Sequence, residues 1–109
     1  MKTIYDIDIS REMMKNKLCD LVNQVYKILP LKESDSPTLN QYLAGLMREL
    51  LGFKALIVAL HDDGLYASLL SIIQFLSDND CDNAVVKTDV FKAIGIVKKL
   101  QKKYENSEE

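Results

Sequence analysis

Four segments of the chain carry apolar residues at alternating spacings of four and three, and this pattern constrains the fold more than any other feature. The spacing follows the turn of an α-helix and gives each segment one apolar stripe that must pack against another element. It predicts helices over 11–29, 37–60, 64–77 and 84–105. The stripes are Met14, Leu18, Leu21, Val25 and Ile28; Leu39, Leu43, Leu46, Leu50, Phe53, Ile57 and Leu60; Leu65, Leu69, Ile72 and Leu76; and Val86, Val90, Ala93, Val97, Leu100 and Tyr104.

Four such helices with short connections predict an all-α fold, an antiparallel up-down bundle of four helices. The chain has 109 residues, about the usual size of one domain. We therefore assign residues 1–109 to a single helical domain, with a short N-terminal arm over 1–9 and a frayed polar tail over 106–109. Glycine (4) and proline (2) are scarce, which argues against the many turns of an all-β domain.

Polar residues and prolines mark the ends of the helices. Ser10 can cap the first helix with its hydroxyl, and Pro30 should end it, because proline disfavours helical geometry in the residue before it. Ser36 can cap the second helix, with Pro37 in its first position. The candidate caps of the last two helices are Asp62 or Asp63 and Asp82 or Asn83.

Two segments fit more than one structure. The run ALIVAL over 55–60 suits a buried strand as well as a helix, and we favour helix because the spacing of four and three continues through it. Residues 5–9 alternate apolar and acidic side chains, as a strand does. The sequence offers this segment no second strand, so we expect a docked arm or an extra helical turn.

The composition favours a protein that stays in the cytoplasm. Asp6 and Asp8 interrupt the apolar run that a secretory signal would need. The longest charge-free apolar run, 64–77, is too short to span a bilayer as a helix, so we expect no membrane association. Cys19 and Cys81 are too few for a disulfide framework, and we expect two free thiols.

The second predicted helix carries more apolar residues than one stripe needs. Such a helix is either central in its own fold or covered by another chain, and we favour an interface, in a homodimer or with another protein, over a central helix. Gly45 and Gly52 lie seven apart on one side of it, and a close helix approach there is one reason to keep them. The interface candidates are Tyr42, Met47, Leu51, Leu56 and Val58.

Catalytic chemistry finds no support in the sequence. His61 is the single histidine, which excludes sites built from several histidines, and we expect it on the surface at a helix end. Cys19 lacks any supporting motif and is expected to be small and half-buried. The four glycines form no phosphate-binding loop. We therefore predict no catalytic residue, no cofactor and no enzyme.

One acidic loop has the ligand spacing of a calcium site. Counted from Asp78, oxygen ligands fall at positions 1, 3, 5 and 12, which resembles a degenerate EF-hand loop. Asn83 stands at position 6, where such loops carry glycine, and Asp89 is one methylene shorter than the usual glutamate. An acidic loop that caps the next helix is the favoured alternative. The weak metal candidates are Asp78, Asp80, Asp82 and Asp89.

The last predicted helix is rich in lysine, and a basic helix can follow the phosphates of a nucleic acid. Arginine, which supplies most bidentate contacts to bases, is absent from this helix, and the chain carries a net charge of −2. We favour a solvated face there. The nucleic-acid candidates are Lys98, Lys99, Lys102 and Lys103.

These observations favour a small cytoplasmic adaptor or regulator, a non-enzymatic module for protein–protein interaction of the kind found in bacteria and phages. Two alternatives stay open. One is a nucleic-acid-binding regulator that uses the lysine-rich last helix, and the other is a calcium-responsive protein that uses the loop over 78–89.

Overall fold

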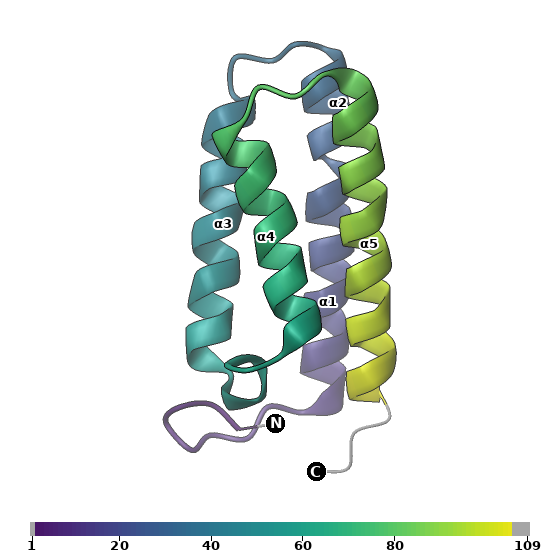
Figure 1. Ribbon diagram of the computed structural model, residues 1–109. Helices are drawn as coiled ribbons and strands as arrows, with labels where there is room; N and C mark the ends of the chain where they lie inside the picture. The colour runs from purple at the N-terminus through teal and green to yellow at the C-terminus, as the bar shows by residue number, and fades with distance from the viewer. Residues whose placement is uncertain (1, 106–109) are drawn as a thin grey trace.

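The computed structural model describes residues 2–105 and shows an all-α protein in which four long helices pack against one another (Figure 1). The predicted antiparallel bundle of four helices is confirmed; the tail over 106–109 lies outside the described residues. A short helix follows the first long one, and a single turn of 3-10 helix follows the second. The elements are α1 (Arg11–Tyr26), α2 (Ile28–Glu33), α3 (Leu39–Leu56), η1 (Val58–Leu60), α4 (Gly64–Asp78) and α5 (Asn83–Glu105).

The last helix, α5, makes the most extensive contacts with the other helices. It packs along α1, α2 and α4, whereas α3 lies along α4 and α2 (Figure 1). α1 and α4 therefore occupy opposite corners of the bundle. α5 buries seven residues and α3 buries only three, Leu43, Leu46 and Leu50. The alternative in which the second predicted helix is a core helix wrapped by the other three is therefore wrong.

The first predicted helix does not end at Pro30. It breaks at Lys27, and α2 continues in nearly the same direction to Glu33 (Figure 1). Pro30 is the third residue of α2, within the first turn, where a missing N–H costs no intrahelical bond. Proline thus interrupts the ladder one turn before its own position, because it has no N–H to give to the carbonyl of Tyr26.

The prediction of helix through residue 60 is also wrong. α3 ends at Leu56, and Ile57 is extended, fully buried and paired with Thr3 in an isolated antiparallel bridge. The arm thus docks on Ile57 of the same chain, a pairing that the sequence pattern did not predict. A second bridge, between Lys2 and Asp8, closes the arm into a tight loop.

The predicted caps are largely confirmed. The side chains of Ser10 and Asp63 accept the backbone N–H groups of Met13 and Tyr66, and Asp82 accepts that of Val85. α3 begins two residues later than predicted, at Leu39, and the Ser36 hydroxyl instead accepts the N–H of Thr38 in the turn before it. α4 and α5 begin and end within one residue of the prediction. The buried side of α4, however, is rotated about the helix axis from the predicted apolar stripe.

That rotation changes which side of α4 meets the core. Tyr66 and Ile73 are fully buried, whereas Leu65 and Ile72, assigned to the apolar stripe from the sequence, are only half-buried. The Tyr66 hydroxyl donates to the backbone oxygen of Leu50 at 2.7 Å, so burying this polar ring leaves no unpaired donor. The rotation brings two large apolar side chains to the edge of the exposed surface.

Candidate functional site

The acidic loop between α4 and α5 does not assemble a metal site. Over residues 2–105 no group of three or more histidine, cysteine or carboxylate side chains is placed to hold a metal ion. Asp78 accepts a hydrogen bond from Gln74, Asp80 lies 3.7 Å from the Lys32 ammonium, and Asp82 caps α5. Each of these carboxylates thus serves a local contact, and Asp89 lies further along α5.

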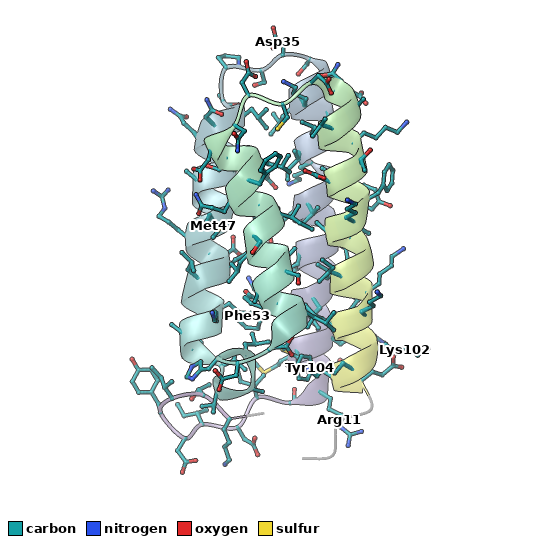
Figure 2. All side chains as sticks on the ribbon, viewed as in Figure 1. Arg11, Asp35, Met47, Phe53, Lys102 and Tyr104 are labelled. Carbon is teal, nitrogen blue, oxygen red and sulfur yellow. The ribbon has the colours of Figure 1, made fainter. Side chains whose placement is uncertain are left out.

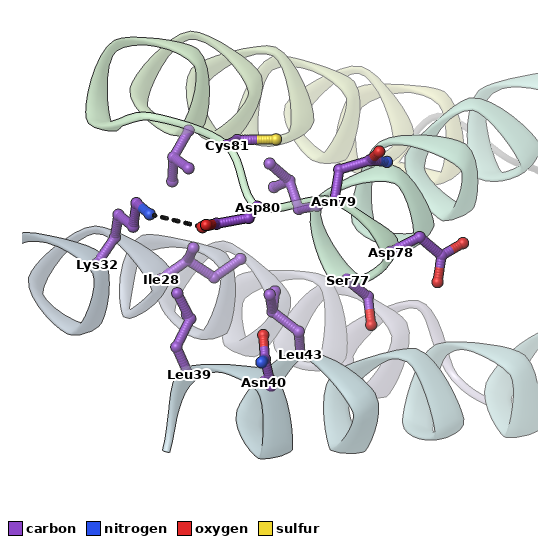
Figure 3. A pocket seen from close by; sticks show the side chains of 12 residues that line it. Ile28, Lys32, Leu39, Asn40, Leu43, Ser77, Asp78, Asn79, Asp80 and Cys81 are labelled. Carbon is purple, nitrogen blue, oxygen red and sulfur yellow. Dashed lines mark ion pairs between the residues drawn. The ribbon is translucent and has the colours of Figure 1, made fainter. Parts of the chain in front are cut away.

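A cavity of about 440 Å³ opens at the same end of the bundle, between α2, α3 and the loop that joins α4 to α5 (Figure 3). Its floor is apolar, with Ile28, Leu43 and Leu76 fully or almost fully buried. The Lys32–Asp80 ion pair lies at one side of it (Figure 3). The volume suits a small ligand, but the Asn79 amide on its rim already donates to the Phe75 carbonyl, and Asp80 itself is fully exposed.

The candidate reactive side chains are isolated from one another. His61 is exposed, as expected, and its Nε2 lies 3.1 Å from the backbone oxygen of Ala55. Cys19 is an exposed free thiol that accepts a hydrogen bond from Gln101, so the expectation that it is half-buried is wrong. Cys81 is a half-buried free thiol beside the cavity. Within residues 2–105, neither cysteine thiol is hydrogen-bonded to His61.

The most tightly bonded polar group is Asp63, whose side chain is completely buried where α4 begins. One oxygen accepts the N–H of Tyr66, and the other accepts Lys103 Nζ at 2.7 Å and the Tyr104 hydroxyl at 2.5 Å. Burial by itself would raise the pKa of Asp63, but these hydrogen bonds outweigh it and hold the pKa below its usual 3.8. Figure 2 shows Tyr104 at this end of the bundle. The cluster ties α5 to α4 and is a structural element.

The structure divides the five interface candidates between different surroundings. Tyr42 faces α1, where its hydroxyl donates to the Gln24 carbonyl at 2.6 Å, and Leu56 packs partly buried against the core. Val58 lies exposed in η1. Met47 lines a shallow groove with residues of α4, and Leu51, one turn later on the same side of α3, is 47% exposed.

The two glycines of α3 are not sites of close approach within the chain. A β-carbon added at Gly52 would meet nothing within 4 Å, and one at Gly45 would meet only the end of the Arg48 side chain at 3.9 Å. The expectation that another helix packs closely there is therefore wrong for the contacts of this chain. A polar row instead joins this side of α3 to α1, with Lys17 Nζ 2.6 Å from Glu49 Oε1.

The outer surface of α4 differs from those of the other long helices in its lack of charged side chains. No charged residue occurs in this helix before Asp78, its last residue. The outward-facing positions are small, polar or apolar, and Phe75 is 48% exposed. We call this surface the α4 face; it consists of Leu65, Ala67, Ser68, Ser71, Ile72, Gln74 and Phe75, all exposed or half-buried.

The exposed positions of the other long helices carry charges, and on α1 and α5 these recur along the whole helix. On α1 they include Arg11, Lys15 and Asp20, and on α5 they include Lys92 and Lys99. Because charged residues keep a helix surface in water, their absence along four turns of α4 sets this helix apart. The sequence contained this signal, a run of fourteen residues from Gly64 to Ser77 without charge. This run was considered only as a possible membrane span, and not as an uncharged surface of a helix in a bundle.

The four lysine candidates of α5 lie on two adjacent stripes of the helix, Lys98 with Lys102 and Lys99 with Lys103. Lys103 bonds Asp63 beside α4, and Lys99 lies one turn before it on the same side. Lys98 shares a stripe with Phe91, seven residues earlier, whose ring meets that of Tyr26 on α1 at 6.2 Å in an edge-to-face arrangement. Lys102 points away from the bundle at its lower end (Figure 2). The exposed Tyr26–Phe91 pair was not found from the sequence, because its members come from helices far apart in the chain.

None of the helices within residues 2–105 combines the length and the hydropathy needed to cross a membrane. Comparison with protein-family models, with curated proteins and with solved structures finds no match. What this chain does has to be inferred from its own surface.

Proposed function

We propose that this chain is a non-enzymatic interaction module that binds another protein chain through the α4 face, as a small adaptor or regulator in the cytoplasm. The observation that carries the proposal is the lack of charge over the exposed length of α4. The centres of protein interfaces are depleted in charged residues and enriched in aromatic residues and methionine. The α4 face carries no charge, and Phe75 and the neighbouring Met47 are of the enriched types.

The energetic argument rests on the large side chains. Phe75 and Leu51 are each about half exposed. Covering the exposed half of a phenylalanine, roughly 100 Å², stabilises a complex by about 2.5 kcal/mol at 25 cal/mol per Å². Small residues between the large ones, such as Ala67 and Ser71, leave room for a partner helix to approach.

Native mass spectrometry of the protein purified from its own cells tests the proposal, with the variant Ser71→Arg as the perturbation. Ser71 is exposed and its hydroxyl bonds only to the Ala67 carbonyl, one turn earlier, so arginine fits the helix and places a bulky charge in the middle of the α4 face. Asn16→Arg, on the exposed side of α1, is the matched control.

We expect a mass above the 12.4 kDa of one chain for the wild type and for Asn16→Arg, and the mass of one chain for Ser71→Arg. A wild-type protein that is a bare monomer, or a complex that Ser71→Arg leaves intact, would refute binding through this face. Unchanged thermal melting of both variants shows that the substitutions act on association.

Nucleic-acid binding is a second candidate, favoured by the exposed Tyr26–Phe91 pair. Exposed aromatic rings give unpaired bases a stacking surface, and lysines beside them attract the backbone. Lys87 and Lys98 lie on the same stripe of α5 as Phe91, four residues before it and seven after it. In a mobility-shift assay with single-stranded DNA, Phe91→Ala and Lys98→Glu should each weaken a salt-sensitive shift. No shift at low salt would exclude this function.

A further inference from the structure

Resting on the proposed function, we propose that the partner on the α4 face is a second copy of this chain, with α4 packed antiparallel against α4 of the partner. A symmetric dimer places the same patch on both sides of its two-fold axis. An uncharged helix face then meets an uncharged helix face, and no charge is buried without a partner. A partner with a charged surface would have to bury its charges against the α4 face without opposite charges to pair them.

The shape of the α4 face suits a helix crossing near its middle. Ser71 is the central residue of α4, seven residues from each end, and Ala67 and Ser68 lie one turn before it. All three side chains are small and exposed, so two such helices can approach to the short end of the usual 8–10 Å range. Phe75 and Ile72 flank this centre and pack against the partner's copies on either side of the axis.

Charge sets the direction of the two helices. Asp78 ends α4 on the side that borders α3, in the groove shared with Met47. Lys54 lies in the last turn of α3, at the opposite end of the bundle, where α4 begins. An antiparallel two-fold about Ser71 lays α3 over α3 of the partner and brings each Asp78 to the partner's Lys54. A parallel arrangement would instead set the two Asp78 carboxylates together, at the end of the bundle that also carries Asp80 and Asp82.

The available area fits a dimer of moderate stability. A stable specific dimer buries about 800 Å² from each partner, which is about one eighth of the 6502 Å² accessible surface of the chain. The molecule measures 43 × 23 × 20 Å, so a long side has the room. The α4 face alone is one helix wide, and Met47 and Leu51 of α3 must join it.

Light scattering after size-exclusion chromatography of the pure recombinant chain, from about 10 to about 500 μM, tests the dimer over the range in which moderate affinities are resolved. The variants are Asp78→Lys, Lys54→Glu and the two combined. Each single change turns two attractive pairs into two repulsive ones, because the symmetry doubles every substitution. The combined change restores opposite charges across the axis.

We expect a dimer for the wild type, about tenfold weaker dimerisation for each single variant, and recovery to near the wild-type value for the combined variant. The matched controls Asp20→Lys on α1 and Lys98→Glu on the α1 side of α5 carry the same charge changes away from α4, and they should dimerise as the wild type does. Thermal melting of each variant confirms that it is folded.

A wild-type chain that stays monomeric at the highest concentration overturns the inference. If that chain nevertheless forms a complex in its own cells that Ser71→Arg abolishes, the proposed function stands and the partner is another protein. If the wild type dimerises but the combined variant does not recover, the antiparallel arrangement is wrong. If Ser71→Arg leaves the recombinant dimer intact, the α4 face is not its interface and the inference fails, whereas the proposed function is still decided by the complex from the protein's own cells.

Discussion

Removing the Asp63 carboxylate should destabilise the bundle by about 3 kcal/mol, a large part of the 5–15 kcal/mol that holds a small domain together. The side chain has no contact with solvent and accepts three hydrogen bonds. Loss of the α4 cap costs about 1 kcal/mol. Loss of the Tyr104 hydrogen bond to a charged group costs about 1.5–3 kcal/mol. Lys103 is half exposed, so its ion pair adds only about 0.5 kcal/mol.

Urea unfolding at pH 7 measures this loss. For Asp63→Ala we expect the midpoint to fall by about 2 M, from 3 kcal/mol and a slope near 1.5 kcal/mol per molar. Asp62→Ala, at the exposed neighbouring position, is the control and should change stability by less than about 0.5 kcal/mol. In a double-mutant cycle with Tyr104→Phe, the double variant should lose at least about 1 kcal/mol less stability than the sum of the two single losses, because both substitutions remove the same contact. Strict additivity, or a loss below about 1 kcal/mol for Asp63→Ala, would refute the reasoning.

Three further predictions follow from single contacts. The stability that Asp63 contributes should be complete above its usual pKa of 3.8 and be lost as the pH falls from there through the lower pKa of the folded state; acid unfolding of Asp63→Asn should lack this step. Gly52→Ala should raise the free energy of unfolding by about 0.5–1 kcal/mol, since its β-carbon meets open space in a helix, and a lower melting temperature would contradict this. Thr3→Ala should cost about 1 kcal/mol and speed hydrogen exchange at Tyr5 and Ile7, whose N–H groups the Thr3 hydroxyl accepts; unchanged exchange there would count against a docked arm.

The local pattern of the sequence predicted what depends on local geometry. The periodic stripes located all four long helices, and the caps at Ser10, Asp63 and Asp82 followed from their short polar side chains. The break at Lys27 was missed because Pro30 fits the first turn of a new helix as well as it ends an old one. The caps depend only on neighbouring residues. Whether Pro30 ends one helix or begins another depends on how the segment packs in the rest of the fold.

The remaining features depend on contacts between distant residues. Ile57 is extended and not helical because it pairs with Thr3, more than fifty positions earlier. No residue within 55–60 indicates this pairing. Lys103 and Tyr104, which bind Asp63, lie about forty residues away on α5, so the local pattern predicted the cap but not the cluster. The surplus apolar residues singled out only α3 as a candidate surface, whereas the longest charge-free run belongs to α4.

The packing of α5 against α1, α2 and α4 has a consequence for the synthesis of the protein. α1 and α4 lie at opposite corners and join mainly through α5, the last of the described helices to leave the ribosome. Until its residues emerge, the sides of α1 and α4 that pack on α5 in the folded chain have no partner there. At 5–20 residues per second the 23 residues of α5 take about one to five seconds to make. During that interval the nascent chain presents its buried surfaces, and the uncharged α4 among them, to chaperones and to neighbouring copies on the same message.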